Sequence, residues 1–482
     1  MCDGSMERHW QIDSERMRSL ARIIEPLRRA GFTARLCGGG VRDRLLGRSP
    51  ADDDLATDAQ PGDVTVALEA AGLRVVPTGV AHGTVTAVAG GHGFEITTLR
   101  RDLRTFGRHA EVQFGDVAWE EDARRRDFTI NALYADLDGT IYDYVGGEAD
   151  LAGGRVRFVG DPEERIKEDF LRILRLFRFH ARFARHPLDA ATLAAVRRWT
   201  PYLTHISRER VAAEWWALLA TERPRAALEA MQQHGVLAVV VPEIGAMPDV
   251  PQRNPYHDRD VARHSWHTLF ALFELEEGRH ARIAPDGTVD PEGARACAPI
   301  PRLPLLRHLA LFHDLAKPLC HRREGEPPRD RFLGHDEVGA RMIERQLRRL
   351  GRGQGDRDDA GLMIRRHLYL LQHESSASHR RLYRQVGPRL FTRLLYLALA
   401  DGAAMQPHSF ARCRDSLLPL LEEIDDWALP PPLPVSGRDL LNLGVAQGPA
   451  VGELLGRLRE WWEGEEPAPD REQCLAWLRA RL

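Results

Sequence analysis

The sequence predicts an α+β protein in which a small mixed-sheet head precedes a remainder built entirely of helices. Three observations predict this arrangement. Short strand-like runs alternate with helical segments between about residues 14 and 140. Apolar residues at helical spacing dominate after about residue 160, and proline-rich segments near 242–255 and 429–434 interrupt the helical part. The 482 residues are also too many for one ordinary core.

Each part is predicted from its local pattern. The boundaries are a head over residues 1–140, a helical neck and body over 141–250, a further helical domain over 251–405 and a helical tail over 406–482. In the head, strands are predicted over 34–38, 53–57, 73–77, 84–89 and 94–99, with helices over 17–29 and 63–71. Later helices are predicted over 161–185, 189–199, 207–219 and 223–234, and the Gly-, Asp- and Pro-rich stretch 283–304 is expected to be an irregular loop.

Composition restricts the class of protein. Hydrophobic residues make up 43% and charged residues 28%, values typical of a globular protein in water. No apolar run is long enough to cross a bilayer, and the N-terminus lacks a signal-peptide pattern. The six cysteines form no Cys-x-x-Cys pair, which predicts reduced thiols and a cytoplasmic protein. The net charge of −3 means that any RNA binding must depend on local basic patches.

The most informative motif joins a glycine-rich turn to a strand with two carboxylates. Gly38, Gly39 and Gly40 open a short amphipathic helix, and their backbone N–H groups can approach a triphosphate. Asp52 and Asp54 are one residue apart on a predicted strand, so they project from the same face and can bind the same pair of divalent cations. Either feature alone is usually a turn or a solvated loop. Together they predict a two-metal site for nucleotidyl transfer.

A charged stripe on a predicted helix indicates an anionic ligand. Asp169, Arg172, Arg175 and Arg178 recur at every third residue, and all the other positions between 170 and 179 are apolar. A helix that is apolar on both sides of its charged stripe is expected to pack between other elements, with its charges lining an internal cleft. The alternative is a stripe of surface salt bridges, but the presence of the carboxylate motif favours the cleft.

The order and spacing of these motifs resemble the DNA polymerase β nucleotidyltransferase superfamily. The class II branch, which holds CCA-adding tRNA nucleotidyltransferases and bacterial poly(A) polymerases, is the most similar. The resemblance covers about residues 30–245 and implies that Asp52 and Asp54 are catalytic ligands of Mg²⁺, with Glu95 as a candidate third acid. It also implies that Gly39, Arg42 and Arg126 bind the nucleotide.

The same resemblance assigns the charged stripe to base selection. Asp169 and Arg172 would present hydrogen-bonding groups to the Watson–Crick edge of the incoming base, while Arg175 and Arg178 would support this pair or reach the phosphates. Residues 99–112 resemble the flexible loop of members that add both C and A, and residues 143–151 resemble the family's neck motif.

A separate set of histidines and aspartates lies in the later helices. His267, the pair His313-Asp314 and Asp401 occur in the order seen in the HD phosphohydrolase superfamily, and this resemblance implies a site for a divalent metal. His335 and His367 are additional candidates. A His-Asp pair alone is not specific, but this one is followed by one of only two lysines in the chain. The alternative is that the domain persists as a scaffold for handling RNA.

The predicted function is addition of CCA to the 3′ end of tRNA from CTP and ATP, without a nucleic-acid template. tRNA, CTP and ATP are the expected partners, whereas a membrane and DNA are not. The expected cofactors are Mg²⁺ in the head and a second divalent metal in the HD domain. The alternatives are a poly(A) polymerase, an A-only or CC-only enzyme, and a protein whose main activity is HD phosphohydrolysis. A non-catalytic RNA-binding protein is the weakest alternative.

Overall fold

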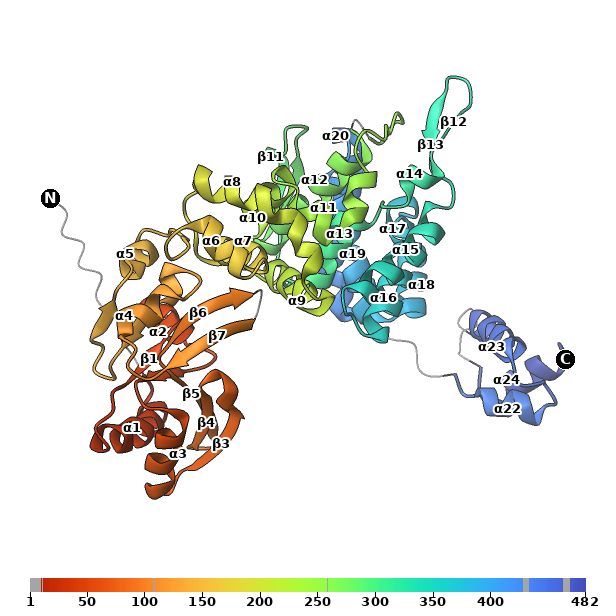
Figure 1. Ribbon diagram of the computed structural model, residues 1–482. Helices are drawn as coiled ribbons and strands as arrows, with labels where there is room; N and C mark the ends of the chain where they lie inside the picture. The colour runs from red at the N-terminus through yellow and green to blue at the C-terminus, as the bar shows by residue number, and fades with distance from the viewer. Residues whose placement is uncertain (1–9, 11, 107–108, 258, 428–432, 463–468) are drawn as a thin grey trace.

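A computed structural model of the chain describes residues 10, 12–106, 109–257, 259–427, 433–462 and 469–482 (Figure 1). The head, a long helical middle and a small helical tail follow one another in chain order, so the predicted α+β class is confirmed. Within the described part of the chain, no helix combines the length and the apolar character needed to cross a membrane.

The head is built on a seven-stranded mixed sheet with the order β3-β4-β5-β2-β1-β8-β9. Its strands are β1 (Ala34–Cys37), β2 (Asp54–Thr57), β3 (Arg74–Gly79), β4 (Thr84–Ala89), β5 (His92–Thr98), β8 (Leu133–Ala135) and β9 (Ile141–Asp143). Only the β2–β5 pair is parallel among the pairings of this sheet in the described residues. The accompanying helices are α1 (Ser14–Arg29), α2 (Gly39–Leu45), α3 (Pro61–Ala70) and α4 (Trp119–Arg124).

The segment expected to be a flexible loop is instead a two-stranded hairpin. Strands β6 (Arg100–Phe106) and β7 (His109–Phe114) pair in antiparallel register, from Arg100 opposite Phe114 to Phe106 opposite His109. Residues 107 and 108 of the expected loop lie outside the described residues. Polar and apolar residues alternate along β7, from His109 to Phe114, and this strand pattern favours pairing over an open loop.

The neck and body are helical, as expected, but the long helix predicted over 161–185 is two helices. The helices are α5 (Gly147–Ala152), α6 (Pro162–Glu168), α7 (Arg172–Phe183), α8 (Ala190–Trp199), α9 (Arg208–Leu219), α10 (Arg225–Gln233) and α11 (Val236–Val240). Asp169 adopts an extended conformation, with φ −153° and ψ 107°, and ends α6. Asp169 therefore stands before α7 and not on it, which changes the predicted stripe.

The region after residue 250 contains hairpins as well as helices, so the expectation of an all-helical middle is wrong there. Its helices are α12 (Val261–Glu276), α13 (Pro304–Phe312), α14 (Lys317–Cys320), α15 (His335–Arg349), α16 (Gln354–Arg366), α17 (Tyr369–Gln372), α18 (Ser376–Val386) and α19 (Pro388–Ala403). Strands β10 (Arg279–Ile283) and β11 (Val289–Ala296) occupy much of the stretch expected to be loop. Their turn contains Asp286 and Gly287, and Gly287 has a φ of +86°, which is a strong hairpin signal.

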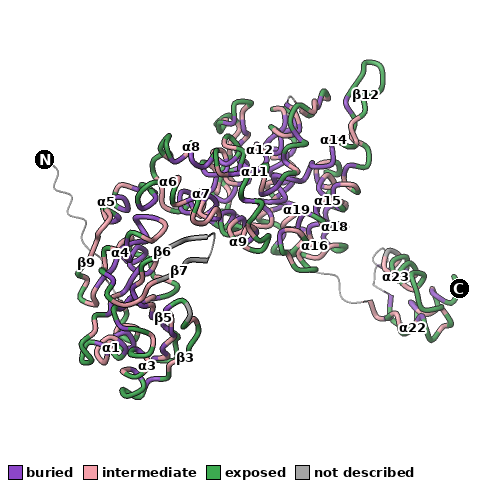
Figure 2. The backbone as a smooth tube through the Cα atoms, in the orientation of Figure 1, coloured by how far each residue is buried: buried purple, intermediate pink, exposed green. Residues whose placement is uncertain are grey.

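A second hairpin and the tail complete the chain. Strands β12 (Arg322–Glu324) and β13 (Arg329–Arg331) project beyond the surrounding helices (Figure 1). The remaining helices are α20 (Pro407–Leu417), α21 (Leu420–Glu423), α22 (Gly437–Asn442), α23 (Pro449–Trp462) and α24 (Arg471–Arg479), and short 3₁₀ turns are η1 (Val80–His82), η2 (Thr129–Asn131), η3 (Thr200–His205), η4 (Pro242–Ala246) and η5 (Ile424–Asp426). The last three α-helices enclose a small hydrophobic cluster of their own, visible as buried segments in Figure 2.

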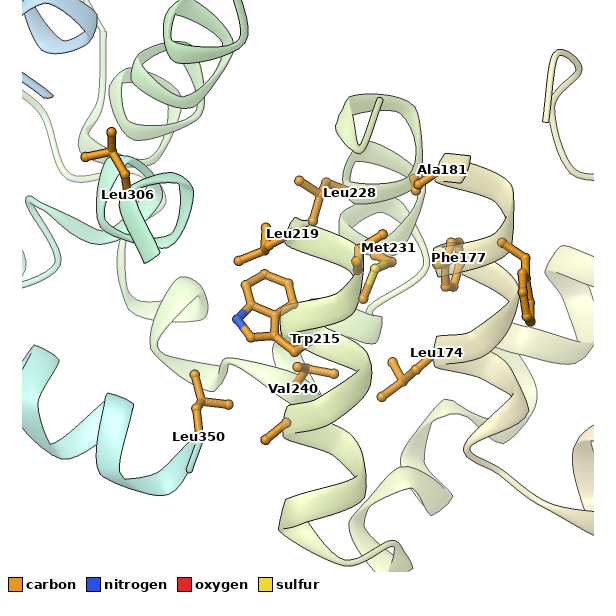
Figure 3. Close-up of a cluster of buried hydrophobic side chains, with 14 of the residues drawn as sticks. Leu174, Phe177, Ala181, Trp215, Leu219, Leu228, Met231, Val240, Leu306 and Leu350 are labelled. Carbon is orange, nitrogen blue, oxygen red and sulfur yellow. The ribbon is translucent and has the colours of Figure 1, made fainter. Parts of the chain in front are cut away.

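Helix α9 is the central element of the helical core. Its Trp215 and Leu219 are buried, and Figure 3 shows them between Phe177 of α7 and Leu306 of α13. Polar contacts reinforce this packing: Trp215 Nε1 donates to His308 Nδ1 at 3.3 Å. The helix next to the predicted nucleotide cleft thus shares one continuous core with the histidine-rich region.

Candidate functional site

Three carboxylates meet at one edge of the head sheet. Leu55 of β2 pairs in parallel register with Ile96 of β5, so Asp54 and Glu95 are neighbours, and Asp52 lies two residues before the start of β2. Burial, reinforced by the negative charges of Glu95 and Asp52, raises the pKa of Asp54 from 3.8 to about 6. A divalent cation would relieve this repulsion, and oxygen ligands suit Mg²⁺. The donor set therefore fits the predicted metal site.

The middle aspartate of the motif has a structural role on the opposite face. Asp53 is fully buried at its side chain and accepts hydrogen bonds from Arg44 Nη2 at 2.9 Å and Arg16 Nε at 2.5 Å. Burial acts to raise the pKa of Asp53, but its hydrogen bonds to Arg44 and Arg16 outweigh burial and hold the pKa below its ordinary value. Alternation along the chain thus separates two metal-ligand candidates, exposed Asp52 and half-buried Asp54, from one residue that ties α1 and α2 to the sheet.

The glycine turn brings the backbone close to several functional groups. Gly38 has a φ of +68°, a conformation that favours glycine, and a Cβ there would lie 3.2 Å from Arg126 Nη1. At Gly40, a Cβ would lie 3.1 Å from both Asp52 O and Asp53 Oδ1. Side chains at these positions would displace the arginine or the carboxylate strand. The turn therefore fixes the distance between the predicted nucleotide-binding and metal-binding groups.

A cleft of about 440 Å³ lies between Asp54, the one of these three carboxylates that lines it, and α7. Six of the seven predicted nucleotide-binding residues line it, as does Asp54. The lining residues are Gly38, Gly39, Arg42, Asp54, Arg125, Arg126, Asp127, Asn131, Asp169, Leu171, Arg172, Arg175, Phe179 and Arg210. Five of these are arginines of the head and α7 and a sixth comes from α9, so the cleft suits a polyanionic ligand.

Arg178 is the predicted nucleotide-binding residue that the cleft does not include. Its Nε donates to Glu214 Oε2 at 2.6 Å, on the side of α7 that packs against α9. Arg178 follows Arg175 by three residues, and the stripe drifts around the helix far enough to carry it out of the cleft. The structure therefore corrects this part of the prediction: Arg178 joins α7 to α9.

The other cleft residues are held by neighbours that the sequence did not single out. Arg175 Nε donates to Asp127 Oδ2 at 2.8 Å, and Asp169 Oδ2 accepts from Arg210 Nη2 at 2.6 Å. Arg42 donates to Asn131 Oδ1. These contacts link residues 36 or more positions apart, so local sequence patterns could not reveal them.

Asp169 and Arg172, the pair predicted to select the base, are held in a defined geometry. Asp169 Oδ1 accepts from Leu171 N at 3.0 Å, which fixes the carboxylate at the break between α6 and α7. Arg172 Nη1 donates to Arg165 O at 2.8 Å and also contacts Glu168. Both side chains are partly exposed to the cleft, so they keep hydrogen-bonding capacity for a ligand.

A second site centres on Asp314, at the end of α13. Its Oδ2 lies 3.2 Å from His313 Nε2 and 3.8 Å from His264 Nε2, while its Oδ1 lies 3.5 Å from His335 Nε2 and 3.6 Å from His367 Nε2. Two groups of three potential ligands, His264–His313–Asp314 and Asp314–His335–His367, therefore share one carboxylate.

These ligand atoms are buried and lack hydrogen-bond partners of good geometry among the described residues. The orphaned atoms are His264 Nε2, His313 Nε2, Asp314 Oδ1 and Oδ2, His335 Nε2, His367 Nε2 and Asp401 Oδ1. Unpaired buried polar atoms are costly, and their convergence fits a bound metal. Burial lowers the pKa of His335 to about 4, so its ring is neutral at pH 7, as metal binding requires.

His267 does not belong to this cluster, so its predicted role as a ligand is wrong. Its Nδ1 faces Arg259 Nη1 at 2.5 Å, and its Nε2 points toward Gly287. Burial and the charge of Arg259 lower its pKa to about 3. His264, on the same helix, takes the predicted position, with its Nε2 2.9 Å from Asp401 Oδ1. Three residues along a helix leave both histidines within about 60° of each other, so spacing alone could not choose between them.

A pocket of about 580 Å³ lies next to the cluster. Lys317 lines it and donates from Nζ to Gln252 Oε1 at 2.6 Å, and its Nζ forms an ion pair with Asp314 Oδ2 at 2.5 Å. The pocket also includes His257 and His335, so a ligand in it would lie beside the cluster. The arrangement suits metal-assisted chemistry on a bound phosphate.

Three protein-family models match successive parts of the chain. A model described as "Poly A polymerase head domain" matches residues 34–157. One described as "Probable RNA and SrmB-binding site of polymerase A" matches residues 187–247, and one described as "HD domain" matches residues 261–405.

Relatives and solved structures match over almost the whole chain. The mitochondrial CCA tRNA nucleotidyltransferase 1 of Danio rerio is 30% identical over 470 residues, which cover 95% of this chain and 90% of the relative. The Homo sapiens protein of that name is 30% identical over 92% of this chain and 86% of the relative. The crystal structure of the Bacillus stearothermophilus CCA-adding enzyme with CTP has a TM-score of 0.63 and 26% identity, covering 98% of each chain. The chain therefore belongs to the family of CCA-adding tRNA nucleotidyltransferases.

Proposed function

We propose that the cleft between the carboxylate edge and α7 adds CCA to the 3′ end of tRNA. CTP and ATP are joined stepwise without a nucleic-acid template, and pyrophosphate is released. The observation that carries this proposal is the meeting of an acidic edge, Asp52, Asp54 and Glu95, with an arginine-lined cleft that could hold a triphosphate.

Different residues of the chain would bind the phosphates, the metal and the base. Bound Mg²⁺, held by Asp52 and Asp54, would neutralise charge on the attacking ribose hydroxyl and the leaving pyrophosphate. Arg42 and Arg126 lie beside the glycine turn, where their guanidinium groups can bind phosphate oxygens in a bidentate manner. Positioning of the phosphates and stabilisation of their charge account for most of the catalysis in such reactions.

Base selection is assigned to Asp169 and Arg172. A carboxylate accepts and a guanidinium donates, so the pair can satisfy the Watson–Crick edge of cytosine or adenine after a small shift. Arg210 and Glu168 restrain the two side chains and would limit that shift. A pocket with fixed polar groups rejects the wrong base by leaving those groups unpaired. The protein would then act in place of a template.

One experiment tests this function and its alternatives. The full chain is incubated with tRNA ending at the discriminator base and with CTP alone, ATP alone or both, and the products are sequenced. CCA addition requires both nucleotides and stops at three residues, whereas a poly(A) polymerase would extend with ATP alone. Asp52→Ala and Asp54→Ala should each nearly abolish addition in folded protein. Near-normal turnover in both variants would refute the site assignment.

We also propose a second function, metal-dependent phosphohydrolysis, for the site around Asp314. The observation that favours it is the set of buried ligand atoms without hydrogen-bond partners among the described residues: five residues form two overlapping groups, and Asp401 contributes a sixth. The shared Asp314 would hold one metal with His264, His313 and Asp401, and a second with His335 and His367. Imidazole and carboxylate ligands suit transition metals as well as magnesium. Lys317, beside Asp314, would bind substrate phosphate from the pocket.

Metal content measured on the full chain tests this second proposal. Elemental analysis after loading with Mn²⁺ should find two ions per HD site, beyond those in the head. The double variant His335→Ala with His367→Ala should lose one of them. His267→Ala is the matched control, because this buried histidine lies on α12 but outside the cluster, and it should keep both. Equal metal content in the double variant and the control would overturn the two-metal arrangement.

The cellular location of the protein remains a prediction. We keep the cytoplasmic assignment from its cysteines as a proposal, while the Danio rerio and Homo sapiens relatives carry "mitochondrial" in their names. Among the described residues, all five cysteines are free.

A further inference from the structure

The β12–β13 hairpin carries an unusual concentration of unpaired arginines. Arg322, Arg323, Arg329 and Arg331 are exposed, and within the described residues none of them forms an ion pair. By contrast, Arg412, an exposed arginine that also lines the neighbouring pocket, pairs with Glu374 at 3.1 Å. The hairpin stands free of the surrounding helices, and Figure 2 shows it exposed along most of its length.

The register of the hairpin places like charges against each other. Arg322 lies directly opposite Arg331, and Arg323 lies opposite Asp330. Like charges in a cross-strand pair are destabilising. Asp330 does little to compensate, because it is buried and accepts hydrogen bonds from Arg253 N at 2.6 Å and from His321 at 2.8 Å. An isolated hairpin gains nothing from this arrangement, whereas a polyanion bound across it would.

The two remaining acidic residues lie at the far end of the hairpin. Glu324 is opposite Arg329, and Glu326 lies in the turn. The base of the hairpin therefore presents Arg322 and Arg331 on one face, and Arg323 lies on the other face. This cationic base is the end of the hairpin that joins the rest of the domain. Its positive charge therefore lies close to any ligand that binds the adjacent surface of the domain.

The base of the hairpin opens onto the pocket beside the Asp314 cluster. Arg331 and Leu333 line the pocket, and Lys317 and His335 lie within its wall. Tyr256 also lines it, with 49% of its surface exposed, although tyrosine is usually more buried. An exposed aromatic ring beside cationic groups is the combination by which proteins bind single-stranded nucleic acid, through stacking of a base and neutralisation of the backbone.

We propose that the β12–β13 hairpin is an RNA-binding arm that guides the end of a single strand into this pocket. Arg322 and Arg331 would bind backbone phosphates, and Tyr256 would stack on a base next to the strand end. The identity of the pocket's substrate as an RNA end rests on the proposed phosphohydrolase function. Binding of the strand by the arm does not need hydrolysis and can be tested alone.

Site-specific crosslinking separates this surface from the cleft in the head, which also binds RNA. The full chain carries p-benzoylphenylalanine in place of Leu333, whose side chain is 71% exposed at the rim of the pocket. The probe is a labelled single-stranded RNA of about 12 nucleotides, long enough to span the arm and the pocket. We expect a crosslink that saturates with RNA concentration and weakens as salt is raised.

The arginine variants give a quantitative test. Each phosphate contact with a single strand contributes about 0.7 to the slope of log affinity against log salt, so Arg322→Gln with Arg331→Gln should lower that slope by about 1.4. This corresponds to about 25-fold weaker crosslinking affinity at 0.1 M salt, with the difference vanishing toward 1 M. Arg345→Gln with Arg348→Gln is the matched control: these are two exposed arginines without ion pairs on α15, and neither lines the pocket. The control should behave like the parent.

Three outcomes would overturn the proposal. The first is equal crosslinking in the parent and the Arg322/Arg331 variant. The second is competition by polyglutamate as effective as that by RNA of equal charge, which would indicate an acidic protein segment as partner. The third is competition by AMP alone at equal phosphate concentration, which would indicate a mononucleotide pocket. The variant His313→Ala should retain the crosslink, so loss of hydrolysis without loss of binding would separate the metal centre from the arm.

Discussion

Replacing Asp54 by asparagine should stabilise the metal-free head while it destroys activity. In the metal-free chain the ionised Asp54 is partly buried and faces Glu95 and Asp52, and its pKa is raised to about 6. The folded state therefore holds the Asp54 proton more tightly than the unfolded chain does. An amide of the same shape removes the charge and its repulsion, and it also removes a metal ligand.

The size and pH dependence of this effect follow from linkage. A shift from 3.8 to about 6 corresponds to about 3 kcal/mol at roughly 1.4 kcal/mol per pH unit, an upper limit because the residue keeps some exposure. Since the folded pKa lies above the unfolded one, the stability of the parent falls as pH rises from about 4 to about 6. The advantage of Asp54→Asn should thus be absent below about pH 4 and complete above about pH 6.

Hydrogen exchange of the β1 and β2 amides, measured with a chelator between pH 5 and 8, reads out this local stability. The neighbouring variant Asp53→Asn is the control with the opposite expected sign. It leaves buried Arg44 without its partner and should lose about 3–5 kcal/mol. Adding Mg²⁺ should stabilise the parent more than Asp54→Asn, because the metal binds the ionised carboxylates. The reasoning is refuted if Asp54→Asn is no more stable than the parent at pH 8, or if its stability falls with pH as the parent's does.

Three other variants probe the remaining groups. Glu95→Gln should weaken Mg²⁺ binding measured by calorimetry. It should also move the acid limb of the pH–activity profile to lower pH, because it removes a charge that raises the pKa of Asp54. An unchanged profile would show that Glu95 does not act together with Asp54. Asp169→Ala with Arg172→Ala should raise misincorporation of UTP and GTP by about 10- to 100-fold, the equivalent of one unpaired polar group, and unchanged exclusion in sequenced products would rule out base selection. His313→Ala should abolish hydrolysis of a 2′,3′-cyclic phosphate and spare CCA addition, whereas loss of both in folded protein would show that the two sites are not separate.

The sequence predicted those features that depend on local periodicity. The alternation of Asp52, Asp53 and Asp54 is a property of any strand, and it assigned the two faces before the sheet was known. The glycine turn and the strands that flank it follow from equally local rules. Charges recurring on one helix indicated a cleft for an anion, and most of those charges line one.

The sequence could not predict features that depend on the angle of a helix or on distant partners. Whether Arg178 faced the cleft was decided by Glu214, 36 residues later, and whether His264 or His267 faced Asp314 depended on the rotation of α12 about its axis. The β10–β11 hairpin was missed for another reason. Its Asp286-Gly287 turn was readable, but proline and glycine around it favoured an irregular loop over short strands.

The shared packing of α9 has a consequence for synthesis on the ribosome. The carbonyl of Thr221, just after α9, is satisfied by Arg307, which is 86 residues further along the chain, and Trp216 donates to the carbonyl of Leu350, 134 residues further. At about 5–20 residues per second, the first partner appears about 4–17 s after Thr221 is made. The head can complete its sheet during that interval, but α9, which carries the Arg210 partner of Asp169, cannot complete its core. A transcript truncated before codon 307 would therefore yield a protein whose head sheet is folded but whose helix α9 lacks its later packing partners. The apolar face of α9 would then be exposed to chaperones and proteases.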